Sequence, residues 1–195
     1  MAGQARRLTA PNAWQHRAWW DTYCALVALA VVGFVLVGET SRPMAYRVVA
    51  AGLIACLAAW YVMLGRRLLF VGDTDRRLWT FIAGTTVLLT AATALASAAS
   101  LLLFAVVPLI FTTTPMVPAM AVVVALNLMP SAVYLARTAD VAGTLEGPFP
   151  VAVFVTLFSC AFAFWIDRIV HQSMERADLI DELAASRAEV ARLSH

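Results

Sequence analysis

The fold is decided by the stretch Phe149–His195, which reads FPVAVFVTLFSCAFAFWIDRIVHQSMERADLIDELAASRAEVARLSH. Its first part, Phe149–Trp165, is apolar and long enough to predict a membrane-spanning helix. Its second part, Ile169–His195, is charged, and no Gly or Pro separates the two parts. We therefore predict one continuous helical rod that leaves the membrane. Because the rod carries no C-terminal cap signal before residue 195, we expect it to lead into an output domain beyond that residue.

Apolar side chains recur in the charged part with the alternating four- and three-residue spacing of a heptad repeat. The seam consists of Leu179, Leu183, Ser186, Val190 and Leu193. Glu182 and Arg187 flank it at the positions that form an ion pair between chains in a parallel two-stranded coiled coil, so the pattern predicts a parallel homodimer. The alternative is an amphipathic helix that lies on the membrane. The acidic residues Asp178 and Asp181 on the opposite face disfavour it, because anionic lipid would repel them.

The whole chain has the composition of a membrane protein. Of its 195 residues, 62% are hydrophobic and 13% are charged, whereas a soluble domain has about 25% charged residues. The apolar residues form long runs, which predict an all-α polytopic protein of about six transmembrane helices. The formal net charge of +2 is too small to suggest nucleic-acid binding. No Cys or His pair has the spacing of metal ligands, so we predict no metal site.

Six spans are predicted from these runs. They are Trp19–Val37, Tyr46–Leu64, Leu78–Ala96, Ala98–Phe111, Val117–Ala136 and Phe149–Trp165. The turn between the fourth and fifth spans is placed at Thr112-Thr113-Thr114-Pro115. The fourth span is short, so a re-entrant hairpin is the alternative to a full crossing. Pro108 and Pro130 are expected to kink the fourth and fifth spans.

The arginines predict the orientation of the spans. With six spans and a cytoplasmic N-terminus, eleven arginines lie inside and three, Arg42, Arg47 and Arg137, lie outside. This asymmetry follows the positive-inside rule and predicts a multi-pass protein of the plasma membrane with both termini in the cytoplasm. The predicted parts are a cytoplasmic segment over residues 1–18, a transmembrane sensor domain over residues 19–168 and a cytoplasmic signalling helix over residues 169–195.

The predicted outer loops, Gly38–Ala45, a turn at residues 97–100 and Thr138–Gly147, leave no room for an extracellular ligand-binding domain. Any signal is therefore expected to be detected within the bilayer or at its surfaces. Polar residues inside the spans are Thr85, Thr86, Thr90, Thr93, Asn127 and Thr156. They are expected to bond to neighbouring helices or to the preceding backbone turn, with a ligand-sensing role as the alternative. No ionisable residue lies in the middle of a span, which counts against a transporter.

The membrane-exit junction of the rod is formed by Trp165, Asp167, Arg168 and His171. Residues of this kind are typical interfacial anchors for the end of a transmembrane helix. Asp167 and His171 are also four residues apart, so they can pair on one helix face when the imidazole is protonated.

Short spans, small loops and a last span that leads into LIDELAASRAEVARLSH resemble the membrane sensor region of DesK-like, NarL-type two-component sensor histidine kinases. The resemblance in architecture covers the whole chain, and its specific part is Arg176–His195. In that family the coil leads to a dimerisation and phosphotransfer domain with a REIHD-like motif. His195 follows Arg192, Leu193 and Ser194 and does not match this motif, so the phosphoacceptor role is not transferred to it.

The resemblance implies a sensor module without catalytic or cofactor-binding residues of its own. It also implies an ATP-dependent protein-histidine kinase core beyond residue 195, which would pass phosphate to a response regulator in a phosphorelay. The alternative function is a small membrane permease or transporter subunit with a cytoplasmic helical tail. The stimulus is not identified by any residue of the sequence.

Overall fold

A computed structural model describes residues 13–71, 76–165, 168–169 and 172. Contacts along the chain divide it into two units, Met1–Thr156 and Leu157–His195. The described residues are helices joined by short turns, and no strand occurs among them. The prediction of an all-α chain is therefore confirmed for this part of the protein.

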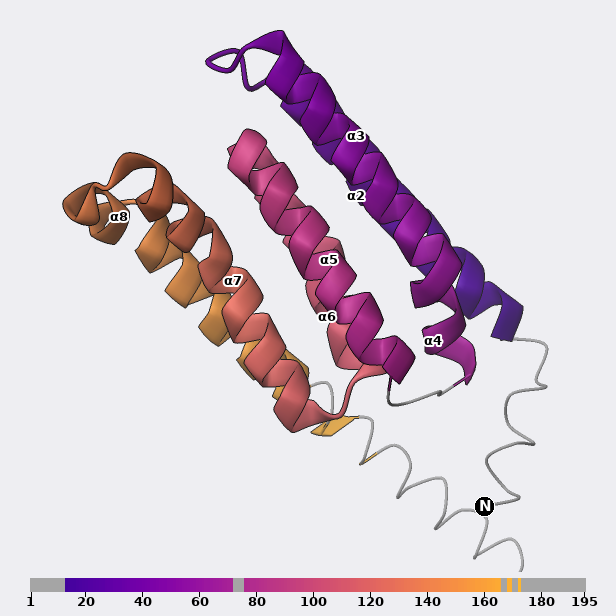
Figure 1. Cartoon of the computed structure of the whole chain (residues 1–195). Coiled ribbons are helices and arrows are strands. Elements are labelled where there is room, and N and C mark those ends of the chain that lie inside the picture. Colours follow the sequence, from indigo (N-terminus) through magenta and orange to yellow (C-terminus); the bar gives the residue numbers. More distant parts are fainter. Residues whose placement is uncertain (1–12, 72–75, 166–167, 170–171, 173–195) are drawn as a thin grey trace, which may run out of the picture. The chain divides into compact units, whose positions relative to one another are not determined.

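The first unit holds a series of helices joined by short connections (Figure 1). They are α2 (Ala13–Val37), α3 (Met44–Trp60), the π-helix η1 (Tyr61–Gly65), α4 (Arg66–Val71), α5 (Arg76–Leu95), the 3₁₀-helix η2 (Ser97–Leu102), α6 (Leu103–Thr113), α7 (Met116–Thr138) and α8 (Val141–Glu146). A further helix occupies residues 148–165 and begins in this unit. The predicted turn before the fifth span is confirmed, because α6 ends at Thr113 and Pro115 immediately precedes α7.

Five helical segments of the described chain are long and apolar enough to cross a membrane. They are Ala18–Val37, Met44–Leu68, Arg76–Leu95, Met116–Thr138 and Val141–Trp165. These segments overlap the first, second, third, fifth and sixth predicted spans, and the last of them begins at Val141, within the predicted outer loop. The chain therefore has the helices of a multi-pass membrane protein, as the length of its apolar runs predicts.

The fourth predicted span is a shorter apolar helix, Ser97–Thr113. Its first six residues form η2 and its last eleven form α6. A 3₁₀-helix rises about 2.0 Å per residue and an α-helix about 1.5 Å, so the two parts together extend roughly 28 Å. That length is close to the thickness of the hydrocarbon core, which is about 30 Å. Pro108 lies inside α6 and Pro130 inside α7, so neither proline ends its helix.

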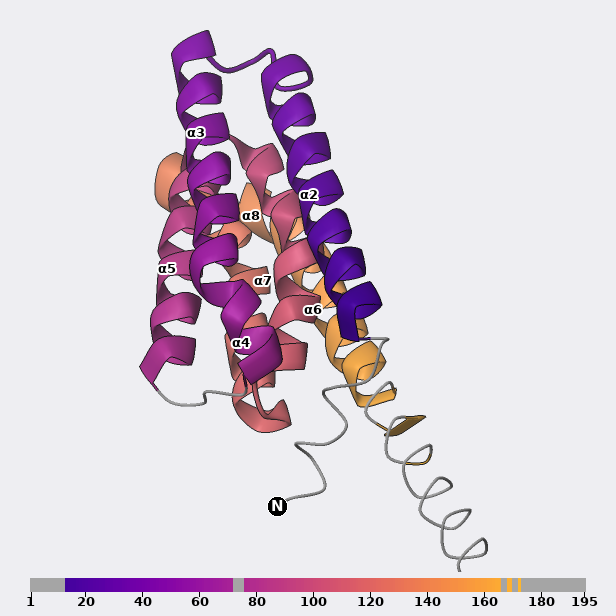
Figure 2. The ribbon, with the colours of Figure 1, turned by 90° about the vertical axis from the view of Figure 1, so that its right-hand side faces the viewer.

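Helix α5 is the centre of the first unit. It packs against α3, η1, η2 and α7, while α2 packs against α3, η2 and α6. Figures 1 and 2 show α2 and α3 side by side along most of their length. The largest fully buried side chains are Phe81, Ile54, Leu89, Ile110 and Leu126, which come from α3, α5, α6 and α7. Val31 and Val35 of α2 are buried in the same core, which is therefore formed by the apolar faces of five helices and of η2. Apolar side chains such as Phe34 and Val87 stay exposed.

Polar contacts join the helices at one end of the first unit, which we call the Glu39 end. The Glu39 carboxylate accepts hydrogen bonds from the Ser97 backbone N–H at 2.8 Å and from the Ser97 hydroxyl at 2.5 Å. Arg47 donates to the carbonyl of Leu36 at 2.8 Å, and Arg137 donates to the carbonyl of Ala94. The two arginines satisfy carbonyls at the C-terminal ends of α2 and α5, where the helix dipole favours positive charge.

The segment predicted as the outer loop Thr138–Gly147 contains a short helix, α8, which was not predicted from the sequence. Asp140 stabilises this helix, because its carboxylate Oδ1 accepts a hydrogen bond from the Gly143 N–H at 2.9 Å and caps the helix. The Thr144 hydroxyl adds a bond of 2.6 Å to the Asp140 carbonyl. The chain changes direction before this cap at Ala139, which has a left-handed φ of 52°.

In the second unit, residues 157–165 are helical. Phe158, Phe162 and Trp165 follow one another along one face, with ring centroids 6.0 Å and 5.8 Å apart, and all three are exposed. Arg168 is helical and exposed. The other residues of the predicted junction, Asp167 and His171, lie outside the described residues. The predicted seam and ion pair, Leu179, Leu183, Ser186, Val190, Leu193, Glu182 and Arg187, also lie outside them.

Candidate functional site

A cluster of polar side chains joins α2 to the second span at the end of the first unit opposite Glu39. Asp21, in the first turns of the first span, pairs with Arg66, whose Nη2 lies 2.9 Å from Oδ2 of the carboxylate. The other carboxylate oxygen accepts a hydrogen bond of 3.2 Å from the Tyr61 hydroxyl. Because the carboxylate and the guanidinium neutralise each other, the cluster presents hydrogen-bonding groups without net charge. The pair is partly exposed, so its own contribution to stability is about 0.2–1 kcal/mol.

The π-helix η1 determines which way this cluster faces. Tyr61 begins η1 and Arg66 follows its last residue, so the two are five positions apart. In an α-helix, with 3.6 residues per turn, positions five apart are separated by roughly 140° around the axis. A π-turn closes between residues i and i+5 and therefore brings both onto one side of the helix. Both side chains can thus reach the same carboxylate of Asp21.

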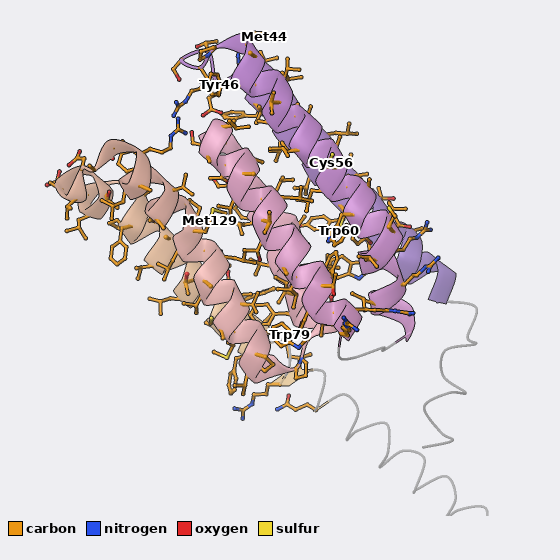
Figure 3. The ribbon with its side chains drawn as sticks, in the orientation of Figure 1. Met44, Tyr46, Cys56, Trp60, Trp79 and Met129 are labelled. Carbon is orange, nitrogen blue, oxygen red and sulfur yellow. The ribbon has the colours of Figure 1, made fainter. Side chains whose placement is uncertain are left out.

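Close packing between the second span and α5 holds this region in place. The Trp60 indole N–H donates a hydrogen bond of 3.2 Å to the Phe81 carbonyl. A β-carbon on Gly65 would lie 2.8 Å from the ring of Phe81, so the absence of a side chain there permits the contact. Figure 3 shows Trp60 between α3 and α5. The π-segment is therefore supported from the α5 side while Tyr61 and Arg66 face Asp21.

An apolar cavity of about 280 Å³ adjoins the cluster. Its walls come from α2, the second span, α5, η2 and α6, and its apolar members include Ile54, Leu57, Phe81, Leu102, Val106 and Leu109. Asp21, Tyr61 and Arg66 lie on its lining together with Cys24. The lining residues Ala25, Ala58 and Val62 are exposed, so the cavity reaches the lipid-facing surface between α2 and the second span.

Thr85 supplies the cavity with a buried polar group. Its side chain is 2% exposed, and its hydroxyl has no hydrogen-bond partner in the described part of the chain. The neighbouring Thr86 bonds to the Ile82 carbonyl at 2.9 Å, and Thr156 bonds to the Ala152 carbonyl at 2.7 Å. The expectation of bonding to the preceding turn therefore holds for these two residues. Thr85 therefore has an unused donor and acceptor in the wall of the cavity.

Two further polar residues of the predicted set are buried without a partner. Thr93 is 3% exposed and Asn127 is 2% exposed, and neither side chain makes a hydrogen bond within the described residues. An unsatisfied buried amide or hydroxyl lowers stability by about 1–3 kcal/mol. Neither residue lines the cavity, which distinguishes both from Thr85.

The cluster of Asp21, Tyr61 and Arg66 was not predicted from the sequence. One signal was present, because Asp21 is the only acidic residue inside the six predicted spans. An acidic residue that enters a span points to a partner or a functional site. Its partners, Tyr61 and Arg66, could not be paired with it from sequence, because their common direction depends on the π-helix.

No protein-family model, no curated protein and no solved structure matches this chain. The function is therefore inferred from the residues of the chain itself. The described residues contribute a polar cluster and a cavity at one end of the first unit, and the sequence contributes the charged helix pattern after Trp165.

Proposed function

We propose that the chain is the transmembrane sensor module of a two-component histidine kinase. The observation that carries the proposal is the heptad pattern of residues 179–193. This pattern follows a helix that is described as far as Trp165, and no Gly or Pro lies between the two. A span that passes directly into a coiled coil can transmit movement from the bilayer to a distant domain. The kinase core with its ATP site would follow residue 195 and would act on a response regulator.

In the proposed topology the protein crosses the plasma membrane six times, and both termini lie in the cytoplasm. The unequal distribution of arginines supports this topology. Two of the three arginines placed outside, Arg47 and Arg137, donate hydrogen bonds to carbonyls at helix ends. The length of Ser97–Thr113, roughly 28 Å, supports a full crossing over a re-entrant hairpin. In this topology the Arg66 cluster faces the cytoplasm and the Glu39 end faces outward.

The proposed transmission is a change in the packing of a parallel homodimer. Such a switch needs two packings that differ by a few kcal/mol. The seam is suitably weak, because Ser186 occupies a core position and Arg176 occupies the first core position after the membrane. Rotation, shift or partial melting of this coil would carry the signal to the kinase core.

Cysteine crosslinking tests the homodimer. In a background without the native Cys24, Cys56 and Cys160, we expect Leu183→Cys or Val190→Cys to crosslink between chains. The matched variants Ala184→Cys and Ala191→Cys lie off the seam and should crosslink less. Equal crosslinking at all four positions would show a loose or membrane-lying helix and would contradict the coiled coil.

Insertion of two glycines between Val170 and His171 tests the transmission in the protein that carries the kinase core. Glycine weakens a helix by about 1 kcal/mol per residue relative to alanine, so the insertion should break the rod. We expect autophosphorylation to become independent of the membrane. The replacement Ser186→Leu should instead strengthen the seam and hold one signalling state. An unchanged response after the glycine insertion would favour a permease with an incidental helical tail.

A further inference from the structure

We propose that the cavity between α2, the second span and α5 binds one small uncharged lipophile that carries hydrogen-bonding oxygen atoms. Its polar end would meet Arg66 and Tyr61, and its body would extend among the apolar walls past Thr85. Binding does not depend on the sensor function proposed above. Only the further step, that occupancy of the cavity is the signal, rests on that function.

The size of the cavity sets the class of ligand. An engineered cavity of about 150 Å³ accepts benzene, and this cavity of about 280 Å³ is nearly twice as large. It can hold a single medium-length chain or a small ring system. A whole phospholipid with two acyl chains is too large to be enclosed, so the proposed ligand is a smaller lipophile that fits inside the cavity.

The charges at the cavity favour an uncharged head group. Asp21 and Arg66 already form an ion pair of 2.9 Å, and Tyr61 bonds to the same carboxylate. An anionic head would have to compete with Asp21 for the guanidinium, and a cationic head would have to compete with Arg66 for the carboxylate. A neutral oxygen can accept a hydrogen bond from the remaining guanidinium N–H groups and leave the pair intact.

Thr85 provides a hydroxyl group that could bind a polar atom of a ligand inside the cavity. The hydroxyl is buried and lacks a partner within the described chain, and the residue lines the cavity. It lies four residues, or about 6 Å along the axis of α5, from Phe81, which packs against the π-segment. A ligand oxygen at this depth would satisfy a group that is otherwise unsatisfied. This observation distinguishes the cavity from a simple packing defect.

Access to the cavity is available from the bilayer. Ala25 on α2 and Ala58 on α3 both line it and are exposed at the surface. A lipophile dissolved in the membrane could enter by this route without crossing water. The polar cluster lies at the same end of α2, where a head group at the membrane surface would be found.

Cys24 provides a direct reporter because its side chain lines the cavity, while the other free thiols, Cys56 and Cys160, do not. The 195-residue chain is placed in phosphatidylcholine vesicles, and the rate of N-ethylmaleimide addition to each thiol is measured by peptide mass spectrometry. We expect 1-decanol to slow modification of Cys24 and to leave the rates at Cys56 and Cys160 unchanged. Equal slowing at all three thiols, or none at Cys24, would overturn the proposal.

Two probes of the same chain length test the head-group class. Decyl sulfate and decyltrimethylammonium should protect Cys24 less well than 1-decanol at equal membrane concentration. Better protection by either charged probe would show that the site selects a charged amphiphile, and the proposal of an uncharged ligand would be wrong.

A pair of matched substitutions tests the role of Thr85. The probe in this test is 1,5-decanediol, which has a second oxygen for Thr85 in addition to the one that meets Arg66 and Tyr61. Thr85→Val keeps the shape and removes the hydroxyl, so the concentration of this diol that gives half-protection should rise about 2- to 13-fold, which corresponds to one ordinary hydrogen bond. Thr93→Val removes an equally buried, unpartnered hydroxyl from the same helix outside the cavity and should leave that concentration unchanged. Equal effects of the two variants would overturn the contact. Because no kinase output is measured, failure here leaves the sensor proposal intact.

Discussion

The indole ring of Trp60 occupies the space that a side chain at position 84 would need. A β-carbon on Gly84 would lie 2.5 Å from Cζ2 of Trp60, well inside normal contact distance. The same indole donates its hydrogen bond to the Phe81 carbonyl, one turn earlier on α5. The close distance between α3 and α5 therefore depends on the contact of the Trp60 ring with Gly84.

Gly84→Ala should destabilise the protein by about 1–3 kcal/mol, because the ring of Trp60 must move and its hydrogen bond must lengthen. The measurement is the free energy of unfolding in micelles during titration with sodium dodecyl sulfate. Gly52→Ala is the matched control, since nothing lies within 4 Å of a β-carbon at that position. The control should be neutral or more stable by about 0.5–1 kcal/mol. Equal effects at both positions would refute the close approach.

Asn127→Leu should stabilise the protein by about 1–3 kcal/mol. The amide is buried and unsatisfied within the described residues, so its removal relieves an unpaired polar group at little change in volume. The same unfolding titration provides the measurement. Thr86→Val is the control, because its hydroxyl already bonds to the Ile82 carbonyl and no gain is expected. A loss of stability in Asn127→Leu would reveal a partner for the amide, such as a buried water.

Glu39→Ala should destabilise the protein by about 0.5–2 kcal/mol through loss of the cap on η2. The carboxylate accepts from both the N–H and the hydroxyl of Ser97, and alanine leaves both donors without this acceptor. Hydrogen exchange at the Ser97 amide should accelerate, which locates the effect. Glu39→Gln keeps an acceptor oxygen and should retain most of the protection. Unchanged exchange in the alanine variant would rule out the cap.

Reporter fusions after Gly72, Gly147 and His195 test the topology. The six-span arrangement places the first and third in the cytoplasm and the second outside the cell. A phosphatase reporter, which is active only outside, should therefore be active only at Gly147. Activity at His195 would place the C-terminus outside, and that result would exclude both the six-span topology and a cytoplasmic signalling helix.

Much of the helical frame could be predicted from sequence because apolar runs of membrane length have few alternatives. The span predicted at Trp19–Val37 ends at the same residue as α2, and the turn at Pro115 follows from the missing N–H of proline. The helix α8 was missed because its six residues are too few for a periodic pattern. Its cap, Asp140, was the available signal.

The cavity and its polar cluster could not be predicted from sequence. The separation of Tyr61 from Arg66 places them on different faces of an ordinary α-helix, so no periodic pattern joins them to Asp21. Thr85 and Thr86 are the same residue type, yet Thr86 bonds to its own helix and Thr85 lines the cavity without a hydrogen-bond partner in the described residues. Such differences depend on the packing of several helices.

The π-helix at Tyr61–Gly65 accommodates one more residue in its turn than an α-helix would. Removal of one residue between Tyr61 and Arg66 would allow an α-helix to form without interruption. Arg66 would then follow Tyr61 by four positions, roughly 40° away around the axis, and its guanidinium would stay on the side of Asp21. A related chain that is one residue shorter in this segment can therefore keep the same cluster on an unbroken α-helix.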